Sequence, residues 1–197
     1  MSESVTEMSP EEIMDRLMAA VMDGWMRDLD NNFVNSWDFA AGTIFDLDFW
    51  SDETLTNKNL VDYLADFASL ASSNLSIDKK EFVELWSLLT PEQRKSFLKD
   101  FYHKVALYGL KDFLNYIGKG LSLKDVEDYL SGKISFHDLM VKLAKKYGID
   151  KCSDNELFYE EIAASFLNGV DLANYVSDEE LKELVRKIVL PKLIKRK

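Results

Sequence analysis

Few residues of this chain combine the type and the spacing that catalysis or metal binding requires. Asp46 and Asp48 are separated by one residue, and two carboxylates at that spacing can bind a metal ion or divide general-acid and general-base roles. Asp100 and His103 stand three positions apart, which places both side chains on one face of a helix, as in helical metal sites. Cys152, the only cysteine, needs a neighbouring base to act as a nucleophile. Each pattern therefore depends on partners elsewhere in the chain.

The two aspartates lie in the stretch Thr43–Trp50, which resembles the Asp-x-Asp motif of the haloacid-dehalogenase-type phosphatases. The resemblance implies that one carboxylate attacks phosphorus, the other serves as acid and base, and both bind magnesium. It is confined to this stretch, because Phe49 and Trp50 replace the Gly-Thr of that family and its last Gly-Asp motif does not follow. The alternation of strands and helices typical of its fold is also missing. We interpret Asp46 and Asp48 as acidic residues of a partly buried segment, not as a catalytic pair.

The other candidate metal sites lack ligands. Helical di-iron bundles use two carboxylate–histidine pairs, but the residue three positions before His137 is Ile134. The stretch Asp28–Asn32 could open a calcium loop, yet Phe33 and Phe39 occupy the positions that require glycine and glutamate. No glycine-rich phosphate loop is present. We therefore expect no catalytic residues, no metal site, no cofactor and no enzymatic activity.

The sequence predicts that helices hold the functional residues in place. A hydroxyl residue followed three positions later by Glu, Gln or Asp is typical of a helix amino-terminal cap, and this pattern begins at Ser9, Thr90, Ser122, Ser135, Ser153 and Ser177. Pro10 and Pro91 would take the first helical position, where the missing N–H costs nothing. Between these signals the apolar residues recur at spacings of three and four. The glycines predicted to end helices are Gly118, Gly132, Gly148 and Gly169.

These signals predict an all-α fold, an irregular, orthogonally packed bundle of about 8–10 helices. The alternating run from Phe45 to Phe49 predicts at most one short strand-like element, near residues 43–50. Internal repeats and low-complexity linkers are absent, so residues 1–197 are expected to form a single helical domain. A sub-boundary near residues 51–58 would separate an acidic amino-terminal part, rich in Met and Trp, from the main bundle.

Charge is concentrated at the amino-terminal end. Residues 1–60 contain 13 Asp and Glu against 3 Lys and Arg, whereas the whole chain has a net charge of −11. Six of the seven methionines and three of the four tryptophans lie in the same stretch. Such asymmetry indicates a surface that binds a partner, without identifying that partner, and the acidic balance argues against a nucleic-acid function for the molecule as a whole.

Composition also limits the compartment. One cysteine permits no intrachain disulfide, the chain has no apolar run long enough to span a membrane, and its first residues are acidic, unlike a secretory signal. We expect a cytoplasmic protein with no membrane association.

A row of methionines is the most specific binding signal. Met residues recur at every fourth position from Met14 to Met26, and a parallel row lies one position earlier, from Ile13 to Trp25. Unbranched, polarizable methionine forms surfaces that adapt to apolar ligands, and acidic Met-rich helices suit basic amphipathic peptides. The alternative interpretation is that the row is core or a homodimer seam.

On this basis we predict a non-enzymatic protein-binding adaptor or dedicated chaperone whose partner has a basic or amphipathic surface. The predicted contact residues are Met14, Leu17, Met18, Val21, Met22, Trp25 and Met26 on the apolar face, with Asp15, Asp23, Asp28 and Asp30 facing the basic rim. Two other functions stay open: an acidic inhibitor of a nucleic-acid-binding protein, and a helix-turn-helix DNA-binding regulator formed by residues 122–148. The basic segment Arg186–Lys197 is either a solvated tail or a segment that docks on an acidic face. Docking on the same chain would give autoinhibition, and docking on a second copy would give head-to-tail assembly into a homo-oligomer.

Overall fold

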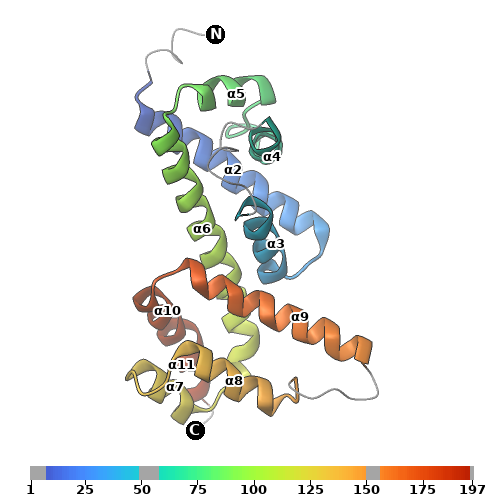
Figure 1. Ribbon diagram of the computed structural model, residues 1–197, viewed down its shortest axis with the longest axis vertical. Coiled ribbons are helices and arrows are strands. Elements are labelled where there is room, and N and C mark those ends of the chain that lie inside the picture. The colour runs from blue at the N-terminus through green and yellow to red at the C-terminus, as the bar shows by residue number, and fades with distance from the viewer. Residues whose placement is uncertain (1–7, 49–57, 150–155, 196–197) are drawn as a thin grey trace. The chain divides into compact units, whose positions relative to one another are not determined.

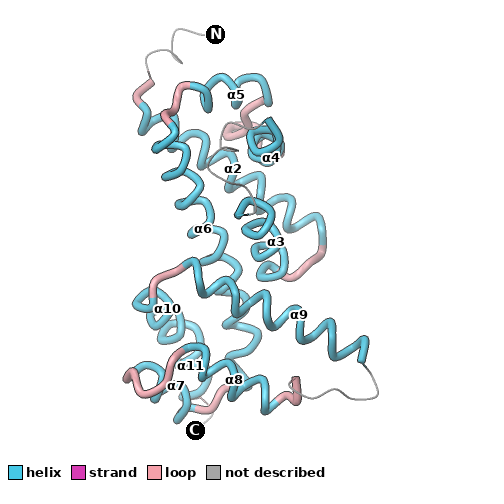
Figure 2. Tube along the Cα trace, viewed as in Figure 1, coloured by secondary structure: helices cyan, strands magenta, loops and turns pink. Residues whose placement is uncertain are grey.

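The computed structural model describes residues 8–48, 58–149 and 156–195 of the chain. All regular structure in these residues is helical and none of them is in a strand (Figure 2), which confirms the predicted all-α class. The chain divides into two compact units: unit 1 comprises residues 1–34 and 43–104, and unit 2 comprises residues 35–42 and 105–197. No helix in the described ranges is both long enough and apolar enough to cross a membrane.

Unit 1 is built around its first helix, α2 (Pro10–Asn32), which packs against α4 (Lys58–Ser69) and α5 (Lys79–Ser87) (Figure 1). The unit also contains residues 43–48 of α3 (Ser36–Asp48) and residues 91–104 of α6 (Pro91–Ile117). Gly24 lies where α2 crosses α4, and a Cβ atom there would stand 1.6 Å from the backbone oxygen of Phe67. The missing side chain therefore allows the two backbones to approach closely.

Unit 2 contains the remaining parts of α3 and α6 and all later helices. These are η2 (Gly118–Gly120), α7 (Leu123–Leu130), α8 (Phe136–Lys146), α9 (Glu156–Leu172), η3 (Ala173–Tyr175), α10 (Asp178–Leu184), the π-helical turn η4 (Val185–Val189) and α11 (Leu190–Ile194). The part of the basic segment that forms α11 is packed on one side, because α11 contacts α7 and η2 and buries Leu193, while Ile194 and Lys195 are exposed. Lys192 Nζ donates hydrogen bonds to the backbone oxygen and Oδ1 of Asn115, at 3.0 and 2.7 Å.

The predicted helix starts are confirmed wherever the structure describes them. Ser9, Ser122, Ser135 and Ser177 each accept a hydrogen bond from the backbone N–H three residues later. Thr90 does the same at 3.2 Å and its own N–H donates to Gln93 Oε1 at 2.9 Å, which completes a reciprocal cap. Ser153 lies outside the described residues.

The predicted helix ends are only partly correct. Gly132 and Gly148 adopt left-handed φ values of 87° and 69°, as predicted. α6 ends directly before Gly118, as predicted, but this glycine begins the short 3-10 turn η2 and does not adopt a left-handed φ. Gly169 lies inside α9, where the prediction of a helix end is wrong because this glycine makes room for a ring of a neighbouring helix.

The prediction of a strand-like element near residues 43–50 is also wrong for the residues of this stretch that the structure describes. Residues 43–48 belong to α3, where Ile44 and Leu47 are buried at helical spacing while Phe45 is exposed. The alternation of apolar and acidic residues is thus one part of a longer helical pattern. Residues 49 and 50, and the predicted sub-boundary apart from Lys58, lie outside the described residues.

Candidate functional site

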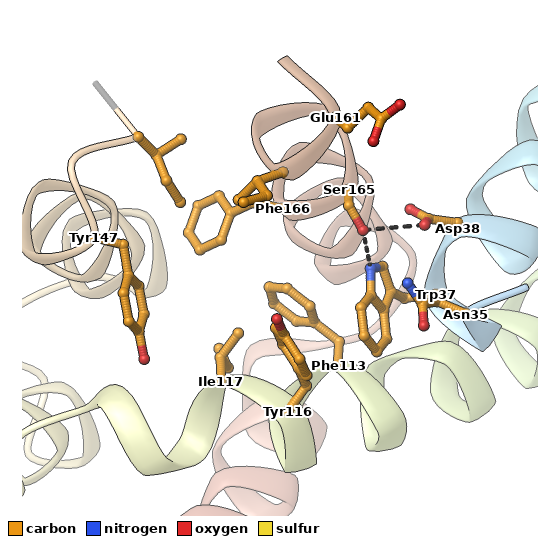
Figure 3. Close-up of a pocket in the computed structure, with 12 residues that line it drawn as sticks. Asn35, Trp37, Asp38, Phe113, Tyr116, Ile117, Tyr147, Glu161, Ser165 and Phe166 are labelled. Carbon is orange, nitrogen blue, oxygen red and sulfur yellow. Dashed lines mark hydrogen bonds between the residues drawn. The ribbon is translucent and has the colours of Figure 1, made fainter. Parts of the chain in front are cut away.

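Unit 2 contains an open cavity of about 770 Å³ that is lined mainly by aromatic and aliphatic side chains (Figure 3). Its walls come from the start of α3, the last turns of α6, the residues that follow α8, and the middle of α9. The lining residues are Asn35, Trp37, Asp38, Phe113, Tyr116, Ile117, Tyr147, Ile149, Glu161, Ile162, Ser165 and Phe166. We call this cavity the aromatic pocket.

Aromatic rings form both the floor and the mouth of the pocket. Trp37 and Phe113 are buried and meet edge to face, with ring centroids 5.8 Å apart. Phe166 packs against Phe113 at 5.9 Å, and Tyr116 lies 5.3 Å from Trp37. Tyr116 is 72% exposed and Tyr147 is 51% exposed, so these two rings stand at the opening. Rings in this arrangement offer apolar surface and faces that attract cations.

A chain of hydrogen bonds holds a carboxylate in the pocket wall. The Trp37 indole Nε1–H donates to Ser165 Oγ at 2.9 Å, and the Ser165 hydroxyl donates to Asp38 Oδ2 at 3.0 Å. Asn168 Nδ2 donates to the other oxygen, Asp38 Oδ1, at 3.2 Å. Figure 3 shows the first two of these bonds linking α9 to the start of α3. The groups that orient the Asp38 carboxylate are therefore neutral, and they do not offset its negative charge.

Glu161 supplies a second carboxylate to the same pocket. It lies one helical turn before Ser165 on α9 and is exposed. No described residue forms an ion pair with either Glu161 or Asp38. The pocket thus combines an apolar interior with two negative charges and no cation of its own among its lining residues.

Glycines and one partly buried hydrogen bond bring the pocket helices together. A Cβ atom on Gly169 would stand 2.2 Å from Phe113 Cδ2, so only glycine lets α9 approach this ring. A Cβ atom on Gly109 would similarly stand 2.6 Å from Leu172 Cδ1. The hydroxyl of Ser36 donates to the carboxylate of Asp112, which ties the start of α3 to α6.

The predicted binding face on α2 lies largely in the core of unit 1. Leu17, Val21 and Trp25 have no exposed surface, and Met18 is 9% exposed. Trp25 also donates its indole N–H to Thr43 Oγ1 at 3.2 Å. These four side chains therefore cannot contact a partner while unit 1 is folded, because the apolar face of α2 packs against its neighbouring helices. The alternative interpretation, a core row, holds for them.

The remaining predicted contact residues keep some exposed surface. Met22 and Met26 are half-buried. Met14 and Asp15 border a groove of about 580 Å³ between α2 and α6, together with Met18 and residues of α6 that include Phe97 and Asp100. Phe97 is the one aromatic residue that lines this groove.

The four predicted rim carboxylates differ in their surroundings. Asp23 Oδ2 accepts hydrogen bonds from the backbone N–H of Ser72 at 2.8 Å and from Arg27 Nε at 3.1 Å. The Ser72 bond in particular lowers the pKa of the Asp23 carboxyl from its ordinary value. Asp23 thus fastens the segment after α4 to α2. Asp15 and Asp30 are exposed and Asp28 is half-buried, and none of the three forms an ion pair with a described residue.

The structure describes only some of the candidate chemical residues. Asp100 is paired with Lys104 at 4.0 Å on α6. The structure does not describe the side chain of Asp48, so the predicted proximity of Asp46 and Asp48 stays a prediction. Cys152 also lies outside the described residues. Within the described ranges no three His, Cys, Asp or Glu side chains are grouped to hold a metal ion.

Two lysines of the predicted helix-turn-helix face are engaged within the unit. Lys142 pairs with Asp125 at 3.5 Å, and Lys146 Nζ donates to the backbone oxygen of Gly120 at 2.8 Å. These contacts join α8 to α7 and η2.

The aromatic pocket was not predicted from the sequence. The sequence contains two weak signals of this pocket. One is Trp37 next to Asp38, and the other is the spacing of Phe113, Tyr116 and Ile117, which is equally typical of a core helix. Comparison with models of known families, with curated proteins and with solved structures finds no match to this chain. The geometry of the pocket is therefore the basis for a functional proposal.

Proposed function

We propose that the protein is a non-enzymatic binding module, an adaptor or dedicated chaperone, that captures a basic amphipathic segment of a partner protein in the aromatic pocket. One observation supports this most: the pocket lining combines aromatic rings with two carboxylates at its edge, Asp38 and Glu161, and neither carboxylate forms an ion pair with a described residue. The single cysteine favours a reducing compartment, such as the cytoplasm, for this activity.

The chemistry of lysine and arginine fits such a pocket. Both side chains have an apolar stem that packs on rings and a charged head that pairs with a carboxylate. A cation held over an aromatic face gains about 0.5–2 kcal/mol, with the larger values where water is excluded. Apolar residues next to the lysine or arginine in the partner's segment would pack on Trp37 and Phe113 at the floor of the pocket.

The width of the opening favours a protein segment over a small molecule. Tyr116, Tyr147 and Ile162 all line the pocket, yet each is at least 38% exposed. A small ligand seated on the floor would leave these side chains in water. A helix laid across the mouth would cover them and place several side chains in the pocket at once.

The proposal is tested with a fluorescein-labelled amphipathic peptide that has leucines on one face and lysines on the other. Fluorescence anisotropy should show binding at low salt and weaker binding at high salt, since exposed charges are screened. Tyr116→Ala should weaken binding about tenfold, because truncating an aromatic anchor commonly costs more than about 1 kcal/mol. Glu161→Gln should weaken it by a smaller factor and reduce its salt dependence.

Matched controls separate the pocket from general effects. Leu167→Ala removes an exposed side chain from α9 outside the pocket lining, and Glu179→Gln removes an exposed charge from α10. Both variants should bind like the original protein. A peptide with glutamates in place of lysines should not bind. Equal binding of the two peptides, or equal loss in pocket and control variants, would exclude the proposed site.

A further inference from the structure

The carboxy-terminal end of α2 violates the local rules that govern helix ends. Phe33 has a φ of 53°, the only non-glycine residue in the described ranges with positive φ. This left-handed conformation is normally taken by glycine or asparagine, because a larger side chain is strained there. The Phe33 side chain is also 95% exposed, so its ring gains nothing from packing within the chain. Val34 follows and is 47% exposed.

The charge at this end is equally unfavourable. The carbonyl end of a helix carries partial negative charge and is stabilised by cations. The last turn of α2 contains no basic residue, while Asp28 and Asp30 lie within its last five positions. No described residue forms an ion pair with either aspartate. The end of α2 therefore presents an exposed aromatic ring beside a negative charge that nothing described offsets.

The carboxy-terminal end of unit 2 has the complementary features. Ile194 is 54% exposed and Lys195, beside it, is exposed as well. Arg186 and Lys187 are both exposed and share a single acid, Glu183, at 3.5 and 3.4 Å. The sequence continues with two more basic residues. The described end of unit 2 thus presents an exposed aliphatic side chain next to an exposed lysine, in a part of the sequence where basic residues outnumber acidic ones.

We propose that the chain associates head to tail: the end of α2, with Phe33, Val34, Asp28 and Asp30, docks on the basic end of a second copy around Ile194 and Lys195. The contact joins apolar to apolar and acid to base. Because the two surfaces differ, the association is heterologous, and each added copy leaves one surface of each kind available. The few side chains involved make it weak and dependent on salt.

Sedimentation velocity of the full chain tests the assembly. At low salt the weight-average mass should rise above the 22.7 kDa of one chain as concentration increases, and high salt should return it to that value. Phe33→Asn should abolish the rise while keeping or raising the midpoint of thermal unfolding, because asparagine tolerates the left-handed conformation. Phe45→Asn, which removes another exposed phenylalanine of unit 1, should leave the association unchanged.

A charge exchange tests the pairing of the two ends. Asp30→Lys and Lys195→Asp should each weaken association alone, because each variant places like charges in the contact. An equimolar mixture should associate again, since the intact α2 end of one variant meets the intact basic end of the other. A mass of one chain at every concentration, a mixture that stays monomeric, or a Phe33→Asn variant that loses stability would overturn the proposal.

Discussion

Gly169 has more influence on the aromatic pocket than its lack of a side chain suggests. It lies inside α9, where a glycine destabilises the folded protein by about 0.5–1 kcal/mol relative to alanine. A packing contact that alanine could not make explains its presence. The contact is with Phe113, whose Cδ2 atom would lie 2.2 Å from an added Cβ. Phe113 in turn supports Trp37, and Trp37 begins the hydrogen-bond chain to Asp38. A methyl group added at position 169 would therefore displace a ring that lines the pocket.

Gly169→Ala should therefore destabilise the protein by about 1–3 kcal/mol, the usual cost of overpacking, despite the higher helix propensity of alanine. Gly42→Ala is the matched control, because α3 leaves open space within 4 Å of that position. It should stabilise the protein by about 0.5–1 kcal/mol. Chemical denaturation measures both changes, and a Gly169→Ala variant as stable as the original would contradict the role of this contact.

Asp23 provides a pH-dependent contribution to stability. Its carboxylate accepts the Ser72 backbone N–H and an Arg27 N–H, and these bonds hold its folded-state pKa below the ordinary value of 3.8. A carboxyl whose pKa is depressed by folding stabilises the protein above its unfolded-state pKa, and this contribution is lost as the pH falls through the folded-state pKa.

Asp23→Asn should accordingly lower the midpoint of thermal unfolding at neutral pH and have little effect in strong acid, where the original carboxyl is protonated too. Asp66→Asn, which changes an exposed carboxylate on α4, serves as the comparison. An Asp23→Asn effect of equal size at both pH values would show that the charge of the carboxylate is irrelevant.

At the scale of the elements, helix starts were predictable because their causes are local. A capping hydroxyl such as Ser135 and the amide that it satisfies lie three residues apart, so the sequence contains the whole interaction. The end of α2 was less predictable, since Phe33 takes a conformation that its residue type disfavours. Likewise, the periodicity of α2 identified its apolar face but not what covers it. The burial of Leu17 and Met18 depends on α4, α5 and α6, which are distant in sequence.

The aromatic pocket is an extreme case of this dependence. Its lining comes from residues 35–38, 113–117, 147–149 and 161–166. Each of these segments, taken alone, has the composition of an ordinary amphipathic helix or turn. Only the packing of unit 2 brings the rings and the two carboxylates to one place, so no spacing rule within a single segment could predict the site.

At the scale of the whole molecule, charge divides along the two units. The ranges of unit 1 contain 19 acidic and 9 basic residues, whereas those of unit 2 contain 16 and 15. The near balance of unit 2 means that Asp38 and Glu161 act as local charges in the pocket and not as part of a broad acidic surface. The excess charge of unit 1 would instead affect the rate and salt dependence of encounters with basic partners.

The most direct test of the proposed function follows the indole N–H resonances of the tryptophans by NMR during titration with the lysine–leucine peptide. Trp37 donates its indole N–H within the pocket, whereas Trp25 and Trp86 are buried in unit 1, and a Trp37→Phe variant assigns the signal. We predict that the Trp37 resonance shifts progressively and saturably with added peptide while those of Trp25 and Trp86 stay in place. Binding of the peptide without a shift at Trp37, or with shifts confined to unit 1, would contradict the account.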